Sequence, residues 1–113
     1  MIVQRMKKEE KDNFSIAQKY YSVLFSVNGI KVTERETQLI SFMAVNGSIS
    51  YKHVKDDFCK EFNTTNATIN NMVSRLKQLG ILVKDGSKVK IHPMILLDFN
   101  KDVVLQITLG HEE

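Results

Sequence analysis

The fold is decided by Thr64–Gly80, which reads TTNATINNMVSRLKQLG, and by the stretch that follows it, Ile81–Pro93, which reads ILVKDGSKVKIHP. Apolar residues recur in the first stretch at helical spacing, and they predict a helix over Thr65–Leu79 with one buried face. That face consists of Ile69, Met72, Val73, Leu76 and Leu79. The hydroxyl of Thr65 can cap the helix by accepting from an amide of the first turn. The opposite face is polar, and no acidic residue lies between Thr64 and Lys84. Such a helix suits contact with a nucleic acid, whose phosphates repel acidic side chains.

Turn signals after this helix predict a two-stranded hairpin. Gly80 suits the left-handed position that ends many helices. Ile81–Val83 and Val89–Ile91 read as strands, and they flank Asp85-Gly86, which is a strong hairpin signal. Pro93 ends the second strand because it has no amide hydrogen to donate to a ladder.

Three further helices are predicted upstream. The first is expected to begin at Asn13 as its cap residue. Thr33-Glu34-Arg35-Glu36 is a capping box, in which the threonine hydroxyl and the last carboxylate satisfy two amides, and it starts the second helix. Gly47–Ile49 is expected to form a short strand, and Ser50 to cap a third helix. Asn63-Thr64 is the turn between the third helix and the fourth.

The composition is that of one globular domain with an uneven charge distribution. The 113 residues are 42% hydrophobic and 26% charged, and the net charge is only +3. Gly47–Pro93 contains eight Lys and Arg against four acids, whereas Met94–Glu113 contains one Lys against four acids. A polyanion is therefore expected to meet only the middle part of the chain.

Cysteine content and hydropathy favour a cytoplasmic protein. Cys59 is the only cysteine, so an intrachain disulfide is impossible and a reducing compartment is expected. The N-terminal MIVQRMKKEEKDN lacks the apolar segment of a signal peptide. No apolar run approaches the about 18 residues of a membrane helix, so we expect no membrane partner.

The order of helix, helix, short strand, helix, turn, helix and hairpin over Thr33–Pro93 resembles a winged helix-turn-helix domain. Domains of this family occur in bacterial and phage regulators and in plasmid replication initiators. The resemblance rests on TERETQLI at Thr33–Ile40, TNATI at Thr65–Ile69 and RLKQLGIL at Arg75–Leu82. It implies a mainly α fold with a small β-wing, in which residues 32–93 form the winged helix-turn-helix domain. Residues 1–31 are then an N-terminal tail and helix, and residues 94–113 a C-terminal extension.

The resemblance implies a DNA-reading site at the start of the fourth helix. A recognition helix presents its N-terminal residues to base edges in the major groove, which points to Asn66, Ala67, Thr68, Asn70 and Asn71. An asparagine amide can bond adenine bidentately and a methyl group can contact thymine, so A·T-containing sites are favoured. DNA-backbone contacts are implied for Ser50, Tyr51, Lys52, Arg75, Lys77, Lys84, Lys88 and Lys90. About five phosphate contacts would give a log–log salt slope of roughly −4 to −5. The alternative for this helix face is a solvated surface or a protein interface. The alternative for the hairpin lysines is protection of a sheet edge against aggregation.

Apolar segments outside this region predict association. The first helix is apolar on more than one side, so Phe14, Ala17, Tyr21 and Leu24 are candidates for contact with a second copy or another protein. Packing on the same chain is the alternative. Val103–Leu109 alternates as in a half-buried strand, which could extend the hairpin sheet or pair across a dimer. A symmetric dimer would read two half-sites about 34 Å apart.

No catalytic, metal or cofactor site is expected. His53, Cys59, His92 and His111 lack ligand-like spacing, and neither CxxC nor HExxH occurs. The resemblance implies a sequence-specific double-stranded DNA-binding protein, a transcription regulator or replication-control factor, in a bacterial or phage-infected cell. The alternative is a protein-interaction or structural subunit of a larger assembly, such as a phage assembly, that does not bind DNA.

Overall fold

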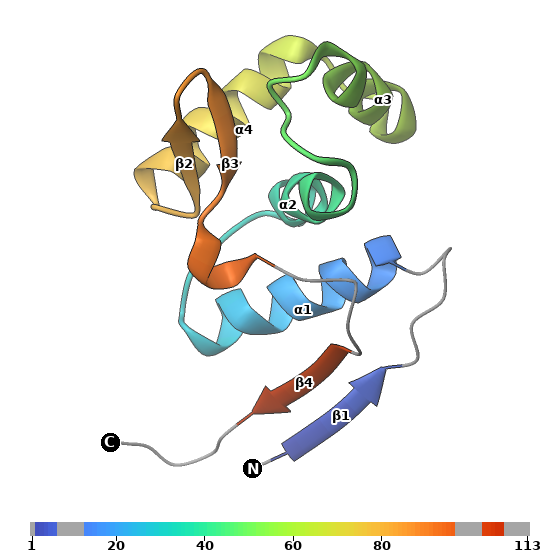
Figure 1. Ribbon diagram of the computed structural model, residues 1–113, viewed down its shortest axis with the longest axis vertical. Helices are drawn as coiled ribbons and strands as arrows, with labels where there is room; N and C mark the ends of the chain where they lie inside the picture. The colour runs from blue at the N-terminus through green and yellow to red at the C-terminus, as the bar shows by residue number, and fades with distance from the viewer. Residues whose placement is uncertain (1, 7–12, 97–102, 108–113) are drawn as a thin grey trace.

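The computed structural model describes residues 2–6, 13–96 and 103–107, with side chains for 13–96. The elements follow in the order β1 (Ile2–Met6), α1 (Asn13–Val27), α2 (Glu34–Asn46), α3 (Lys52–Phe62), α4 (Asn66–Gln78), β2 (Leu82–Asp85), β3 (Lys88–Ile91), the 3-10 helix η2 (Pro93–Ile95) and β4 (Val103–Ile107). The predicted helix-rich fold with a small antiparallel hairpin, β2–β3, is confirmed. A second two-stranded sheet pairs β1 with β4 (Figure 1).

The predicted capping box forms at the start of α2. The Thr33 hydroxyl accepts a hydrogen bond from the Glu36 amide at 3.1 Å, and the Thr33 amide donates to Glu36 Oε1 at 2.8 Å. The pair satisfies two of the amides that a helix start leaves without an intrahelical partner. α1 differs slightly from its prediction, because Asn13 is the first helical residue and not the cap.

α2 lies between α1 and the group formed by α3, α4 and the hairpin (Figure 1). α1 packs along α2 and contributes the buried residues Ala17, Tyr21 and Phe25. α3, α4 and the hairpin add buried residues to the same cluster, among them Val54, Phe58, Ile69, Leu76, Leu82 and Ile91. The Tyr21 hydroxyl donates to the carbonyl of Ile95 at 2.8 Å, which ties η2 to α1. The core thus extends across residue 31, the predicted end of the N-terminal segment.

A three-residue turn, Asn63–Thr65, joins α3 to α4. Asn63 has a φ of 51°, in the left-handed region that asparagine tolerates better than most residues. The Thr65 hydroxyl accepts from the Thr68 amide at 3.2 Å, so Thr65 caps α4 as predicted. α4 buries Ile69, Met72 and Leu76. Leu79, expected on the same face, is 45% exposed because it follows the last helical residue.

The hairpin turns one residue later than predicted. The pairing runs from Leu82 opposite Ile91 to Asp85 opposite Lys88, so Gly86 and Ser87 are the central residues of the turn. Of these two, Gly86 alone has a positive φ, 65°, as a type II′ turn requires of its first central residue. The expected turn at Asp85-Gly86 is wrong because Asp85 still pairs as the last residue of β2.

The short strand expected at Gly47–Ile49 does not form, and Ser50 does not cap α3. The Ser48 hydroxyl donates to the Val89 carbonyl at 2.5 Å, and the Ser50 hydroxyl accepts from the Val89 amide at 2.9 Å. The two serines therefore satisfy the free edge of β3 with side chains, where a third strand would use its backbone. Tyr51 takes the cap position of α3 without a side-chain hydrogen bond.

β1 and β4 bring the two ends of the chain together. They pair antiparallel, from Ile2 opposite Ile107 to Met6 opposite Val103. The sequence predicts a tail where β1 forms, and it leaves β4 to extend the hairpin or to pair with a second copy. In the described residues β4 pairs with β1 instead of with the hairpin or a second copy. The sequence misses this pairing because the two strands lie at opposite ends of the chain, beyond the reach of local patterns.

Candidate nucleic-acid interface

α4 turns one side into the core and leaves the opposite side free. Since Ile69, Met72 and Leu76 are buried, residues about half a turn away point outward. These are Ala67, Asn70, Asn71, Ser74 and Gln78, and all are exposed. We call this set the outward side of α4. It has no charged residue, and the amides of Asn70 and Asn71 have no partner among residues 13–96. They are therefore available to bond another molecule.

Two predicted base-contacting residues lie on the flanks of α4 and are engaged within the protein. The Cys59 thiol donates to Asn66 Oδ1 at 3.4 Å, and the hydroxyls of Thr65 and Thr68 lie 3.1 Å apart. Asn66 and Thr68 nevertheless remain exposed. The other three predicted residues, Ala67, Asn70 and Asn71, belong to the outward side.

Ser74 and Gln78 also belong to the outward side, although they are not among the predicted contacts. The prediction concentrated on the first turns of the helix, which a recognition helix presents to base edges. Their positions can be predicted from the sequence. Ser74 follows Ala67 by seven residues and Gln78 follows Asn71 by seven, and seven residues make two helical turns, which returns to the same side of the helix.

The start of α3 lies beside the hairpin. Ser50 is bonded to β3, Tyr51 is 40% exposed, and the Lys52 ammonium pairs with Asp56 at 2.8 Å. The hydrogen bond with Asp56 raises the pKa of Lys52. No side chain caps the first-turn amides, and no acid occupies the first turn. A helix start of this kind favours an anion such as a phosphate.

Tyr51 connects α3 to the hairpin. Lys88 Nζ lies 4.7 Å from the centre of the Tyr51 ring, and its hydrogen bond with the Tyr51 hydroxyl raises the pKa of Lys88. The His53 ring stacks on Tyr51 with the ring centres 5.8 Å apart. His53 therefore belongs to the candidate site. In the sequence this residue stands out only as a possible metal ligand, and its spacing excludes that role.

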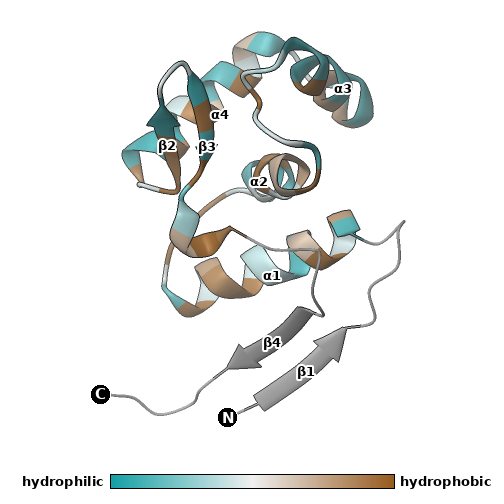
Figure 2. Cartoon of the chain, viewed as in Figure 1, coloured by the Kyte–Doolittle hydropathy of each residue, from teal (hydrophilic) through white to brown (hydrophobic). Residues whose placement is uncertain are grey.

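Four exposed lysines, on α4 and on the hairpin that packs against it, are here called the lysine border. Lys84, Lys88 and Lys90 are exposed on the hairpin strands, and Lys77 is exposed on α4 itself. Lys90 Nζ pairs with Asp85 at 2.8 Å, which lowers the pKa of that carboxyl from its ordinary value of 3.8. Hydrophilic residues predominate along α3 and at the tip of the hairpin (Figure 2). Since an exposed ion pair contributes little, a phosphate can replace Asp85 at Lys90.

Arg75 differs from these lysines because its guanidinium binds within the protein. It donates to Glu36 Oε1 at 2.5 Å and to the Lys31 carbonyl at 2.8 Å. The Glu36 side chain is only 4% exposed, whereas that of Arg75 is 45% exposed. The sequence predicts a phosphate contact here, but position 75 lies on a flank of α4, from which its side chain reaches the start of α2.

The predicted association residues of α1 lie in or against the protein's own core. Ala17 and Tyr21 are fully buried, and Leu24 packs against the core cluster. Phe14 is half-buried, with its ring centre 5.7 Å from that of Phe62. In this fold the four residues pack on the same chain, which is the alternative that the sequence leaves open. Ala17 and Tyr21 have no surface to offer a partner.

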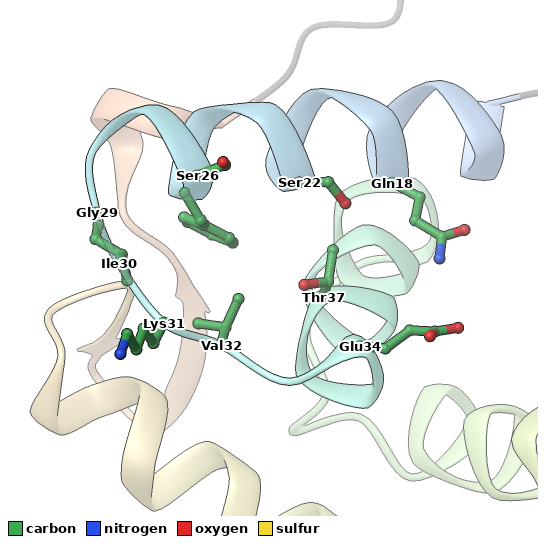
Figure 3. A pocket seen from close by; sticks show the side chains of 10 residues that line it. Gln18, Ser22, Ser26, Gly29, Ile30, Lys31, Val32, Glu34 and Thr37 are labelled. Carbon is green, nitrogen blue, oxygen red and sulfur yellow. The ribbon is translucent and has the colours of Figure 1, made fainter.

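A pocket of about 530 Å³ opens between α1 and the start of α2. Figure 3 shows Ser22 and Thr37 pointing toward one another across it, with Val32 on the segment that closes one side. Residues 13–96 contain no group of three or more His, Cys, Asp or Glu that could hold a metal ion. Among the described helices none is long and apolar enough for a membrane span. The outward side of α4 with its lysine border is therefore the strongest candidate site.

Comparison of the chain with protein-family models, with curated proteins and with solved structures gave no match.

Proposed function

We propose that the protein is a sequence-specific double-stranded DNA-binding protein with a winged helix-turn-helix fold. α4 would lie in the major groove, and the β2–β3 hairpin would contact the adjacent backbone. The protein would act as a transcription regulator or a replication-control factor by occupying a site that another factor needs. The outward side of α4 supports this proposal most, because it combines exposed, unengaged asparagine amides with a border of lysines.

The bases would be read by neutral side chains. Each amide of Asn70 and Asn71 can donate to and accept from one adenine, and the methyl group of Ala67 can contact a thymine. The outward side has no arginine or lysine, so it lacks the most common contact to guanine. We therefore expect a preference for A·T-containing sites.

The DNA backbone would be held by five lysines, Lys52, Lys77, Lys84, Lys88 and Lys90, together with the first-turn amides of α3. Arg75 is not counted because its guanidinium is bonded to Glu36 and Lys31. Five phosphate contacts predict a log–log salt slope of about −4 to −5. Such contacts fix the position of the protein on the duplex without reading its sequence.

Fluorescence anisotropy tests the proposal. Random-sequence and A·T-rich duplexes are titrated at about 50 and 200 mM salt, a range over which phosphate contacts weaken binding steeply. The variants are Asn70→Ala/Asn71→Ala and the matched control Asn46→Ala, which removes an exposed amide from the end of α2. We expect binding at micromolar concentration or tighter, lost in the double variant for A·T-rich DNA and kept in the control. Absence of binding at low salt would reject the proposal.

A homodimer would place two copies of α4 in successive major grooves, about 34 Å apart. Its interface would have to use surface other than Ala17 and Tyr21, which are buried. Analytical ultracentrifugation with and without a duplex tests this part, because a dimer doubles the mass bound to each DNA molecule.

A protein-docking subunit is the second candidate, and one observation favours it. Met94 and Leu96, which follow the hairpin, are 83% and 56% exposed. Exposed apolar residues that lie close together mark interaction surfaces more often than scattered ones do. The variant Met94→Glu separates the candidates, because it should leave DNA affinity unchanged and should abolish only contacts made through this surface.

A further inference from the structure

We infer that Arg75 and Glu36 form a clamp that sets the orientation of α4, so that Arg75 positions the reading helix and does not bind phosphate. For its DNA readout this inference rests on the proposed function. The clamp itself consists of the Arg75 guanidinium, the Glu36 carboxylate and the Lys31 carbonyl. It joins α4 to the start of α2 and to the segment between α1 and α2.

The two ends of the clamp are themselves fixed. Glu36 also accepts the Thr33 amide at 2.8 Å, so its carboxylate is held by the capping box. Lys31 belongs to the segment of Gly29–Val32 that runs beside α4 in Figure 3. The guanidinium is a planar fork whose donors have fixed directions. Bonding both acceptors at once therefore restricts the rotation and the height of α4 relative to α2.

The remaining contacts of α4 are less directional. Ile69, Met72 and Leu76 are buried, but apolar contacts depend on area and shape and tolerate small shifts of a helix. Asn71, on the outward side, lies one turn before Arg75 and is its neighbour on the helix surface. A rotation of α4 that loosens the clamp therefore moves Asn71 as well, and hydrogen bonds to base edges are lost when an amide moves out of register.

A phosphate that replaced Glu36 at the Arg75 guanidinium would open the clamp. The Glu36 carboxylate is 4% exposed and would be left without a counter-charge in the protein interior. Removing one partner of such a pair is costly because a buried charge then has no compensation. Lys77, Lys84 and Lys88 form no ion pair within residues 13–96, so a phosphate contact at these lysines leaves no buried carboxylate without its counter-charge.

Three full-length variants separate positioning from phosphate contact. Arg75→Lys keeps the positive charge but cannot bond both acceptors at once. Glu36→Gln keeps the bond to the Thr33 amide but removes the charge that holds Arg75. Lys77→Gln is the comparison on the same helix, since this exposed lysine has no partner among residues 13–96. Circular dichroism verifies that each variant is folded at the temperature of the assay.

The DNA readout is the preference for A·T-rich over random-sequence duplexes, together with the salt slope. A positioning role predicts that Arg75→Lys and Glu36→Gln each lower the preference about tenfold, the loss expected for one bidentate base contact, without reducing the salt slope. Lys77→Gln should instead weaken both duplexes equally and reduce the slope by about one. Glu36→Gln is the most informative variant. Removing an acidic residue from a DNA-binding protein alone would raise its affinity for DNA, whereas a positioning role predicts a loss of the preference for A·T-rich DNA.

A measurement without DNA tests the clamp independently of the proposed function. Residual dipolar couplings of the backbone amides report the orientation of α4 relative to α2. We expect Arg75→Lys and Glu36→Gln to change that orientation or to average it, and Lys77→Gln to leave it as in the wild type. If the couplings of α4 are the same in all four proteins, the inference is overturned, whatever the DNA result. If they change and no DNA is bound, the clamp stands and the proposed function falls.

Discussion

At the scale of single residues, Glu36 is an acidic side chain with two structural roles. Its carboxylate is almost fully buried, yet it accepts from the Thr33 amide at the start of α2 and from Arg75 on α4. One side chain therefore serves a local helix cap and a contact between distant segments. The local role can be predicted from the four-residue motif. The distant role cannot, because no spacing in the sequence relates position 36 to position 75.

Replacing Arg75 with glutamine should destabilise the protein by about 1–3 kcal/mol, since a buried carboxylate loses its charged partner. This expected loss of stability is smaller than that for a fully buried ion pair because the Arg75 side chain is 45% exposed. Urea unfolding measures it. Lys77→Gln, on the same helix, should stay within about 0.5 kcal/mol of the wild type. Equal stabilities of the two variants would contradict the described role of Glu36.

Asp85 is the acid closest in sequence to the hairpin lysines, and Asp85→Asn should strengthen DNA binding about three- to tenfold by freeing Lys90 and removing a negative charge. Stability should hardly change because the pair is exposed. The folded-state pKa of Asp85 is lowered, so the small contribution of the pair is present above its ordinary pKa of 3.8 and is lost as the pH falls below it. Anisotropy at neutral pH, with Asp57→Asn on α3 as the control, measures the effect. A weaker complex with Asp85→Asn would count against hairpin contact with DNA.

At the scale of elements, the hairpin is attached to the helices by Ser48 and Ser50. Both backbone groups of Val89 that face away from β2 are bonded to these hydroxyls. A strand at the same place would have bonded the same groups through its backbone. These hydrogen bonds depend on two hydroxyls that could be removed without changing any backbone conformation, while the buried Leu82 and Ile91 also hold the hairpin on the core.

Ser50→Ala should leave the Val89 amide without its acceptor and speed its hydrogen exchange, with a loss of about 1 kcal/mol of stability. Exchange measured by NMR at Val89 reports the local effect directly. Ser87→Ala, in the hairpin turn, is the matched control and should leave Val89 unchanged. Unchanged exchange in Ser50→Ala would mean that another group protects this amide.

The elements that the sequence predicts well are those with local causes. α2 and α4 begin where Thr33 and Thr65 cap them, because a cap acts on amides within three residues. The strand at Gly47–Ile49 and the cap at Ser50 are wrong because both serines bond Val89, about forty residues away. β1 is missed for the same reason, since its partner β4 lies at the other end of the chain.

In the candidate site, too, features with local causes can be predicted and features that depend on distant contacts cannot. The exposed positions of Asn70 and Asn71 follow from helical periodicity, and the structure adds Ser74 and Gln78 to them on the outward side. The engagement of Arg75 and the stacking of His53 on Tyr51 depend on tertiary contacts. Residue type and spacing predict which side of a helix is polar, but they do not predict which of its cations are already bonded.

At the scale of the whole molecule, α1 belongs to the core and not to a separate segment. Ala17, Tyr21 and Phe25 are buried together with residues of α2, α4 and the hairpin. We therefore expect residues 32–93 alone to lose the cooperative unfolding transition of the full chain. Calorimetry and circular dichroism of that fragment, next to the full chain, measure this. A fragment that unfolds cooperatively near the temperature of the full chain would show that α1 is dispensable.

The pairing of β1 with β4 has a mechanical consequence. Ile2 lies opposite Ile107 at the outer end of this ribbon, and Met6 lies opposite Val103 at the inner end. A force that pulls the two ends of the chain apart meets the Ile2–Ile107 pair first and peels the ribbon open one pair at a time. Peeling breaks few hydrogen bonds at once and needs little force. The β1–β4 pairing would thus separate at a lower force than the helices need to unfold, so that a pull on the chain ends opens the ribbon first and leaves the core folded.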